Sequence, residues 1–567
     1  MSVACVCLGG LTGVQTCTSE GVYGVCVCPD ASAPTDAASD AWTLDIPVRP
    51  LGPRLITPQS ISRTTTQRPT FRWVLPDGVT RARVTVARDR ALTMDVRTGM
   101  ATGTSWRPTE PLPFAVWFWR VEGLGEDGGV VWTSPTWEFR APRRDTAVDS
   151  SWGTWRDFNG DGYDDLVVLD TGLRPEQVYW GSMRGVSATG TNIDLRSMLS
   201  RDYGWSPNRP QFCDFNGDGL ADLAVEVYGL IRVDIDAGST TPHLSSAVVV
   251  YYGRPSGFAD TPDLIFREPN EIGAIQLVGL TTGDFDGDGF GDALIGEVCG
   301  SSGCDAVRDT LRIRLYSGSS TGLESVSRLQ LAEGEIQPFS ALQGSSRADL
   351  NLDGLPEFQF RTSIGLLVVS SLAGGVASVS TVPAGGEPLF GADFDGDGYG
   401  EWLHASPDSI TFFRWTSTGP APNGWSALRS PDIPSGIAGR SFGMRITAGD
   451  VNGDGYADLI TSAPEAPLPA GAGLRGDGRV YLYPGGVRGP GVLAVRWDAR
   501  PTGIGGIEDN YGAYIASCSD YDGDGFDDVI VTGLNRVEVK YGAARAEDAG
   551  SRTTELRTFS DRPGISD

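Results

Sequence analysis

The chain first shows a regular alternation of apolar and polar positions after residue 50. Period-two runs bounded by proline or glycine lie at residues 70–75, 82–88, 116–123 and 136–142. Alternation of this kind is typical of strands that bury one face. We therefore predict a β-sandwich over residues 51–142, with Trp73 and Trp119 in its core. Residues 29–50 are rich in alanine, serine, aspartate and proline without an apolar period, and we interpret them as a linker.

From residue 150 onward the pattern changes to short apolar runs that recur at long intervals, each after an acidic segment. These runs lie at residues 166–169, 223–227, 293–296, 358–360, 459–464 and 529–533. A second run with an aromatic residue and a glycine near its end follows at residues 178–181, 250–253, 315–318, 482–485 and 539–542. Each repeat is therefore predicted to be a strand, an acidic loop, a strand, a turn, a strand and one further strand.

The acidic segments are seven copies of one nonapeptide, here called loops 1 to 7. They begin at Asp157, Asp214, Asp284, Asp349, Asp393, Asp450 and Asp520. Residues 150–567 give about 60 residues per repeat, which is enough for a four-stranded blade. Seven blades that close into a ring leave no long exposed sheet edge. We therefore predict an all-β chain whose residues 150–567 form a seven-bladed β-propeller.

Each loop presents oxygen donors at positions 1, 3, 5 and 9, and we predict that the main-chain carbonyl of position 7 completes the set. The predicted ligands are Asp157, Asn159, Asp161, Tyr163 and Asp165 in loop 1; Asp214, Asn216, Asp218, Leu220 and Asp222 in loop 2; Asp284, Asp286, Asp288, Phe290 and Asp292 in loop 3; Asp349, Asn351, Asp353, Leu355 and Glu357 in loop 4; Asp393, Asp395, Asp397, Tyr399 and Glu401 in loop 5; Asp450, Asn452, Asp454, Tyr456 and Asp458 in loop 6; and Asp520, Asp522, Asp524, Phe526 and Asp528 in loop 7.

Calcium is the ion that these donors favour, with up to seven ions bound. Calcium takes six to eight oxygen ligands, whereas zinc, copper and iron prefer histidine or thiolate. No acidic residue stands at position 12 of any loop, which excludes an EF-hand. Glycine stands at position 6 of every loop and allows the sharp turn. Loop 4 is the most degenerate copy, with Leu352 and Glu357 in place of glycine and aspartate, and we expect it to bind poorly.

These repeats resemble the FG-GAP repeats of the integrin α-subunit head, a seven-bladed propeller, and the related bacterial VCBS repeats. The sixth repeat is the most similar, with Phe442-Gly443, loop 6 and Ala463-Pro464 in the places of the Phe-Gly and Gly-Ala-Pro signatures. The resemblance covers about three-quarters of the chain and implies a calcium-binding propeller. The strands of residues 51–142 similarly resemble a fibronectin type III domain.

Composition and charge narrow the possible partners. The formal net charge is −27, which excludes a nucleic-acid partner because such proteins need a basic face. No apolar stretch is long enough for a transmembrane helix. The N-terminus lacks a recognisable signal peptide, although Ser2-Val3-Ala4-Cys5 resembles the end of a lipoprotein signal, so Cys5 is a candidate lipid anchor.

The cysteines indicate a location outside the cytosol. Residues 1–28 form a Cys-rich segment, predicted to be a small disulfide knot, that contains Cys5, Cys7, Cys17, Cys26 and Cys28. Cys299 and Cys304 are predicted to form a loop-clamping disulfide. We therefore expect a secreted or surface-displayed bacterial protein.

Three classes of function remain open, and the first is favoured. It is an adhesion or recognition module that binds a protein or glycan on one propeller face, with calcium in a structural role. The second is a structural spacer of a surface or matrix, and the third is a polysaccharide lyase. The two histidines, His243 and His404, have no catalytic pattern around them, so we expect no enzyme activity. The aromatic residues that could stack on sugars are instead expected to pack between blades: Trp180, Tyr251, Tyr252 and Trp415.

Overall fold

The computed structural model describes the larger part of the chain. The described residues are 2–6, 12–16, 52–169, 176–193, 195, 205–232, 242–267, 275–299, 311–330, 349–351, 353–362, 365–370, 378–382, 388–406, 409–416, 419–429, 442–465, 478–499, 509–517, 519–534 and 536–556. The chain divides into two compact units, Met1–Thr43 and Leu44–Asp567.

The first unit contains a short antiparallel hairpin. Strand β1 (Ser2–Val6) pairs with β2 (Thr12–Thr16), and Cys5 lies in β1 opposite Gly13. The predicted knot and the predicted linker cannot be followed further, because Cys7, Cys17, Cys26, Cys28 and residues 29–50 lie outside the described residues. The same is true of Cys304, the predicted partner of Cys299.

The second unit begins with two sheets that share one core, here called the sandwich (residues 52–152). One sheet has the order β3-β5-β8, and the other has the order β12-β4-β11-β9-β6-β7 with β10 paired to β9. Their strands are β3 (Arg54–Thr57), β4 (Ser62–Thr64), β5 (Phe71–Val74), β6 (Arg81–Ala87), β7 (Arg97–Thr102), β8 (Ser105–Trp106), β9 (Ala115–Leu124), β10 (Val130–Thr133), β11 (Trp137–Ala141) and β12 (Ser151–Trp152). Strand β12 extends the second sheet beyond residue 142, the predicted end of the sandwich.

Aromatic side chains fill the core of the sandwich. Trp73, Trp117 and Trp119 are at most 2% exposed. The ring of Phe71 meets that of Trp119 edge-on at 5.0 Å, a favourable geometry for buried aromatic pairs. The alternation in β5, whose residues are buried and exposed in turn, therefore follows the period-two pattern of the sequence.

Seven small antiparallel sheets follow in the part of the chain that is described. Their strands are β13 (Leu166–Val168), β14 (Glu176–Tyr179) and β15 (Thr191–Ile193); β16 (Trp205–Cys213), β17 (Asp222–Arg232), β18 (Pro242–Tyr251) and β19 (Leu264–Arg267); β20 (Ile275–Gly283), β21 (Asp292–Cys299), β22 (Leu311–Ser317) and β23 (Glu324–Gln330); β24 (Phe358–Thr362), β25 (Gly365–Ser370) and β26 (Ser378–Val382); β27 (Pro388–Ala392), β28 (Glu401–Ser406), β29 (Ser409–Thr416), β30 (Gly419–Pro422) and β31 (Leu428–Arg429); β32 (Arg445–Gly449), β33 (Asp458–Ala463), β34 (Arg479–Tyr483) and β35 (Val495–Asp498); and β36 (Ile515–Ala516), β37 (Val529–Gly533), β38 (Arg536–Lys540) and β39 (Thr553–Leu556). One 3-10 turn, η1, spans Ala546–Asp548.

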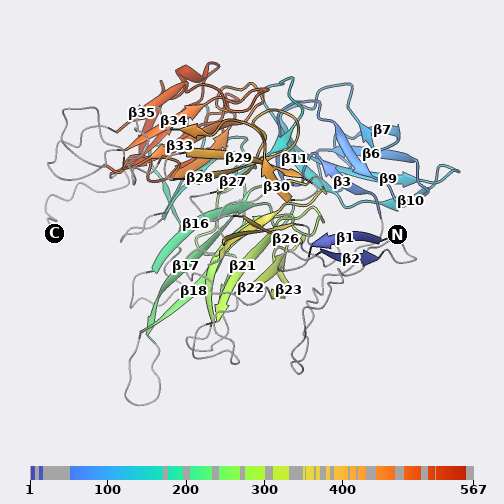
Figure 1. Ribbon diagram of the computed structural model, residues 1–567, viewed down its shortest axis with the longest axis horizontal. Coiled ribbons are helices and arrows are strands. Elements are labelled where there is room, and N and C mark those ends of the chain that lie inside the picture. Colours follow the sequence, from blue (N-terminus) through green and yellow to red (C-terminus); the bar gives the residue numbers. More distant parts are fainter. Residues whose placement is uncertain are drawn as a thin grey trace, which may run out of the picture. The chain divides into compact units, whose positions relative to one another are not determined.

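Each sheet is built from sequential strands, and in five of the seven the acidic loop leads into a strand that pairs on both sides within the described residues. In the second repeat the order is β16-β17-β18-β19, and Figure 1 shows β16, β17 and β18 as adjacent green arrows. Loop 2 connects β16 to β17, whose first residue is Asp222. Val225, Val227 and Val249 are buried, which suits β-branched residues in a strand covered on both faces.

Neighbouring repeats are joined by a hydrogen bond that recurs between their acidic loops. The N–H of position 8 donates to the carbonyl of position 1 in the preceding loop. This bond links Ala221 to Asp157, Gly291 to Asp214, Ala457 to Asp393 and Asp527 to Asp450, at 2.7–3.0 Å. The same bond joins Asp164 of loop 1 to the carbonyl of Asp520 in loop 7, at 3.1 Å. The second, third, sixth and seventh repeats each make this bond to the repeat before them. The first repeat makes the same bond to the last.

A second recurring contact involves the tyrosine next to the glycine of the aromatic-glycine pairs. The hydroxyl of Tyr252 in the second repeat accepts the N–H of Leu323 in the third, at 3.1 Å. The hydroxyl of Tyr541 in the last repeat accepts the N–H of Val186 in the first, at 3.2 Å. Tyr251 is fully buried in the same region. These tyrosines pack between sheets, as the sequence predicts; the side chain of Trp415 lies outside the described residues.

No helix in the described residues combines the length and the apolar character that a membrane crossing requires.

Candidate metal centres

The carboxylate at position 9 anchors each loop to the sheet. One of its oxygens accepts the N–H of position 2 in every loop, at 2.5–3.0 Å. In five loops the other oxygen accepts the N–H of the glycine in the following aromatic-glycine pair: Gly181, Gly253, Gly318, Gly485 and Gly542. Because a carboxylate has about four acceptor sites, these bonds still leave lone pairs for a cation.

The carboxylate at position 1 closes the turn of each loop. Its second oxygen accepts the N–H of the position-6 glycine in all seven loops, at 2.6–3.0 Å. These glycines have φ between +85° and +93°, a left-handed conformation that other residues adopt only with strain. Glycine at position 6 is therefore required by the backbone conformation.

Positions 3 and 5 form two overlapping side-chain turns in every loop. The position-3 oxygen accepts the N–H of position 5. The position-5 carboxylate accepts the N–H of position 7. Asparagine and aspartate are interchangeable at position 3, because either side chain supplies this oxygen. The ligand role predicted for the position-7 carbonyl stays a prediction.

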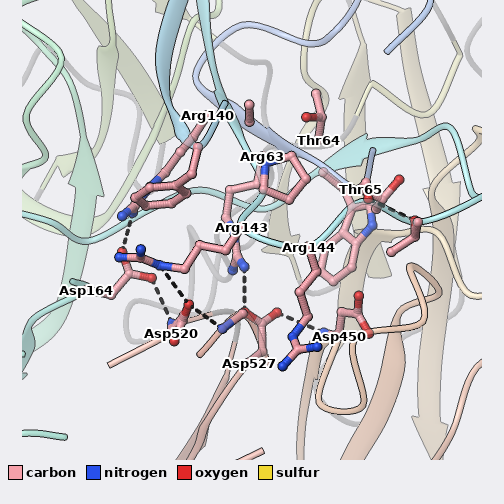
Figure 2. A pocket seen from close by; sticks show the side chains of 16 residues that line it. Arg63, Thr64, Thr65, Arg140, Arg143, Arg144, Asp164, Asp450, Asp520 and Asp527 are labelled. Carbon is pink, nitrogen blue, oxygen red and sulfur yellow. Dashed lines mark hydrogen bonds and ion pairs between the residues drawn. The ribbon is translucent and has the colours of Figure 1, made fainter. Parts of the chain in front are cut away.

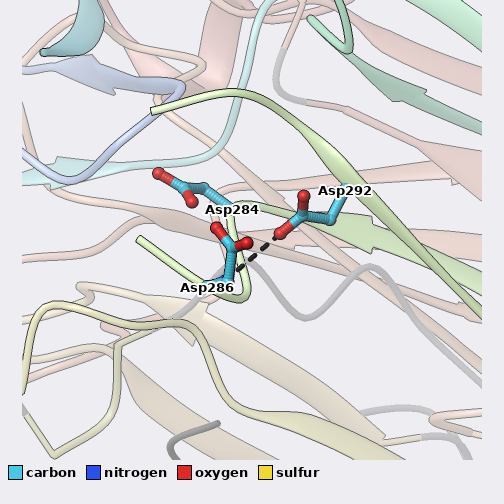
Figure 3. A group of neighbouring side chains, drawn as sticks. All are labelled: Asp284, Asp286 and Asp292. Atoms are coloured by element: carbon cyan, nitrogen blue, oxygen red, sulfur yellow. Dashed lines mark hydrogen bonds between the residues drawn. The ribbon is translucent and has the colours of Figure 1, made fainter. Parts of the chain in front are cut away.

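Four loops bring three carboxylates to one point. Their ligand oxygens lie within 4.8 Å of one another in the groups Asp284–Asp286–Asp292, Asp349–Asp353–Glu357, Asp393–Asp395–Glu401 and Asp520–Asp522–Asp528. Figure 3 shows the first group, in which all three side chains are labelled. Among the described residues, loops 1, 2 and 6 do not meet this distance with their carboxylates. Loop 4 gathers its carboxylates although it is the most degenerate copy.

Burial disfavours the charged form of these carboxylates and raises their pKa values. Desolvation, together with the neighbouring carboxylate of Asp353, raises the pKa of Asp349 to about 8. Desolvation and Asp395 raise the pKa of Glu401 to about 9. The pKa of Asp292 is also well above its usual range, first through desolvation and then through Asp286 and Asp284. Such groups become stable as anions only with a cation beside them, so a hard divalent metal fits the donor set.

Sequence reasoning missed two features of these loops. Asp164 and Asp527, at position 8, are only about 1% exposed, and the sequence pattern assigned them no role. The glycines of the aromatic-glycine pairs were predicted only to lie near the end of a strand, although their N–H groups hold the position-9 carboxylates. The recurrence of that glycine 14 to 31 residues after the loops was the available signal.

Family comparisons match several of these repeats. The FG-GAP repeat model matches residues 442–483, and the FG-GAP-like repeat model matches residues 157–225 and 393–461. Integrin alpha-4 of Xenopus laevis is 33% identical over 94 residues, which are 16% of this chain and 8% of that protein. The chain thus spans less than a tenth of the length of this relative.

Solved structures give only distant similarity. A candidate 6-phosphogluconolactonase of Bacteroides uniformis is 12% identical, with a TM-score of 0.28 over 62% of this chain and 97% of that one. A quinonprotein alcohol dehydrogenase-like protein of Bacteroides thetaiotaomicron is 10% identical, with a TM-score of 0.23 over 80% of this chain and 99% of that one. At these scores the similarity says nothing about chemistry.

The fold and the loops define the class: an all-β protein built from small sheets with repeated acidic loops. Residues 157–225 and 393–483 match FG-GAP and FG-GAP-like repeats, and over 94 residues the chain is similar to an integrin α subunit.

Asp395→Asn is expected to change stability in opposite directions with and without calcium. Asn keeps the oxygen that accepts the N–H of Asp397, as Asn452 does in loop 6 for Asp454. Burial, followed by Asp397, raises the pKa of Asp395 to about 6, so its charge is a cost at pH 7 without metal. The variant should therefore melt higher than wild type in EGTA and lower in calcium. Differential scanning calorimetry in both buffers measures this effect.

Asn452→Asp provides the reverse control, because it adds a carboxylate at the same position of loop 6. It should melt lower than wild type in EGTA and higher in calcium. If both variants shift in the same direction in both buffers, position 3 does not contribute its charge to a metal site.

Proposed function

We propose that the seven repeat sheets close into a ring, a seven-bladed β-propeller. The support comes from contacts that repeat between successive sheets and recur between the last and the first. They include the inter-loop bond from Asp164 to Asp520 and the bond from Val186 to Tyr541. A shared apolar core of Leu166, Tyr179, Val539 and other residues joins the same two repeats. A chain with two open end sheets would leave these groups without partners.

We further propose that calcium fills the acidic loops, with up to seven ions. The donors in each loop are carboxylate, amide and main-chain oxygens, which calcium prefers over other biological metals. The ion would neutralise carboxylates that are buried together and would tie the loop to the strand that follows. Its role in this proposal is structural, because every side-chain donor also accepts a backbone N–H of the same loop.

The function that the repeats support best is recognition at a surface. We propose a secreted or cell-surface calcium-binding module of bacterial origin that binds a protein or glycan ligand on one propeller face, without enzyme activity. The single observation that carries this proposal is the match of several loops to FG-GAP repeats, together with the resemblance to integrin alpha-4. The N-terminal cysteines support an extracellular location, and Cys5 is the candidate lipid anchor.

A glycan array tests the recognition proposal directly. The full chain would be applied in millimolar calcium and again in EGTA, with the variant Asp395→Asn as a folded comparison. Binding that needs calcium would support a recognition module. Absence of any glycan signal, with calcium uptake shown by calorimetry, would contradict a glycan ligand. Release of unsaturated products from acidic polysaccharides would contradict the non-enzyme proposal.

A further inference from the structure

The sandwich donates hydrogen bonds to main-chain carbonyls of the acidic loops. The Arg90 guanidinium donates to Gly217 of loop 2 at 3.0 Å and to Gly289 of loop 3 at 2.7 Å. The indole of Trp137 donates to Gly287 of loop 3 at 3.0 Å. These carbonyls belong to positions 4 and 6, which are not the predicted metal ligands. The loops can therefore hold an ion and the sandwich at the same time.

Two buried ion pairs connect the sandwich to the first and last repeats. Arg140 of β11 lies 2.5 Å from Asp164 of loop 1, and Arg63 of β4 lies 2.6 Å from Asp527 of loop 7. Both aspartate side chains are about 1% exposed. Figure 2 shows these four side chains together around a cavity of about 50 Å³. Pairs so well shielded from water are screened little by salt.

The aspartates of these pairs also hold the neighbouring loops. The second oxygen of Asp164 accepts the N–H of Asp520 in loop 7, at 2.9 Å. The second oxygen of Asp527 accepts the N–H of Asp450 in loop 6, at 2.8 Å. Each aspartate therefore binds an arginine of the sandwich with one oxygen and the adjacent repeat with the other. Loss of the arginine would leave a buried carboxylate without its cation.

A third arginine spans the junction between the two repeats. Arg143 donates to the carbonyl of Gly162 in loop 1, and its Nε lies 3.4 Å from the carboxylate of Asp520 in loop 7. Arg144, next in the chain, donates to the carbonyl of Asp524 at 2.9 Å and stacks on Phe526 at 3.8 Å. The segment that follows β11 within the sandwich thus contacts loops 1 and 7 within two residues.

Aspartate at position 8 is confined to the two repeats that meet here. The other five loops have a residue without charge at that position: Ala221, Gly291, Pro356, Gly400 and Ala457. Asp164 therefore lies at the junction of the first and last repeats, and Asp527 lies in the last repeat, where its other oxygen holds the sixth. A packing contact common to all repeats would not require aspartate at position 8 in the first and last repeats alone.

From these observations we propose that the sandwich is an internal clasp that holds the first and last repeats together. Its binding surface is the acidic-loop end of those two repeats, and its contact residues are Arg63, Arg140, Arg143 and Arg144. Arg90 and Trp137 attach the sandwich to loops 2 and 3 as well. The clasp does not depend on the recognition function or on the identity of the metal.

Hydrogen exchange measured by mass spectrometry on the full chain in millimolar calcium tests the clasp. The double variant Arg63→Gln/Arg140→Gln should speed amide exchange about tenfold in β13, β14, β37 and β38, because opening of the junction becomes easier. Exchange in β17 and β21 should stay close to wild type. Arg83→Gln is the matched control, since it removes an Arg–Glu pair within the sandwich, with Glu122.

Two further variants keep the test decisive if the glutamine variant does not fold. Arg63→Lys/Arg140→Lys keeps both charges, so it should fold and show a smaller increase at the same strands. Arg90→Gln should speed exchange near loops 2 and 3 but not at the junction. The proposal is overturned if the lysine or glutamine variant leaves β13 and β37 at wild-type rates, or if all repeats speed up equally.

Discussion

Removal of calcium with EGTA is expected to lower the midpoint of thermal unfolding by about 10 °C or more. One site at a hundredfold excess of calcium over its dissociation constant adds about 2.7 kcal/mol to the free energy of unfolding. Four of the described loops bring three carboxylates together, so four such sites would add about 11 kcal/mol. In a unit of this size 1 kcal/mol corresponds to a shift of about 1 °C or more. Scanning calorimetry at pH 7.5, with and without EGTA, measures the shift.

The effect of EGTA should grow as the pH rises. The pKa of Asp450 is raised to about 8, mainly by desolvation and then by Asp527, and that of Asp165 is also raised to about 8, mainly by desolvation. In the metal-free chain these groups hold protons between the unfolded pKa near 4 and about 8, so the free energy of unfolding falls as pH rises through that window. Calcium relieves this loss. An EGTA effect that is absent, or that is equal at pH 5.5 and pH 8, would contradict metal binding by the loops.

Gly485→Ala is expected to destabilise the chain by about 3 kcal/mol or more, the range of severe overpacking. A methyl group at residue 485 would lie 2.2 Å from the carbonyl oxygen of Ala457. That residue cannot move aside easily, because its N–H is bonded to the carbonyl of Asp393 in the preceding loop. The N–H of Gly485 also holds Asp458, so the strain reaches loop 6 directly. Equilibrium unfolding in urea with calcium present measures the loss.

Gly398→Ala separates this steric effect from backbone strain. Gly398 has φ of +89° but no atom within 4 Å of an added methyl group, so the expected cost is about 1 kcal/mol. Similar losses in the two variants would mean that the close approach at Gly485 does not limit the fold. Calcium affinity should fall in Gly485→Ala, because the position-9 carboxylate loses its fixed partner.

The sequence predicts the loops well because their geometry is local. The side chains of positions 1, 3 and 5 accept N–H groups within five residues along the chain, so one motif repeated seven times specifies one turn seven times. Asp157 and Gly162 illustrate this, since the carboxylate of one accepts the N–H of the other. Four strands of the sandwich, β5, β6, β9 and β11, were equally predictable, because their alternation is also a short-range pattern.

Contacts between distant segments could not be predicted from local patterns. Asp164 and Asp527 are ordinary acids in the sequence, and only the arrangement in space gives them arginine partners. Arg140 likewise alternates with apolar residues of β11, a pattern that does not indicate its partner. No spacing rule links residues that lie hundreds of positions apart, so the contact of the sandwich with the loops had no sequence signal.

Assembly of this chain during synthesis has a defined last step. Asp164 and Asp520 are 356 positions apart, and closing a flexible loop of that length costs about 5 kcal/mol of entropy. Chains are made from the N-terminus, so the sandwich and the first repeat are complete before the seventh repeat leaves the ribosome. Arg63, Arg143 and Arg144 are then already in place when the final acidic loop is made, and that loop binds to them. A nascent chain that stops before residue 520 would lack the contacts that Arg63 and Arg143 make with Asp527 and Asp520 in the finished molecule.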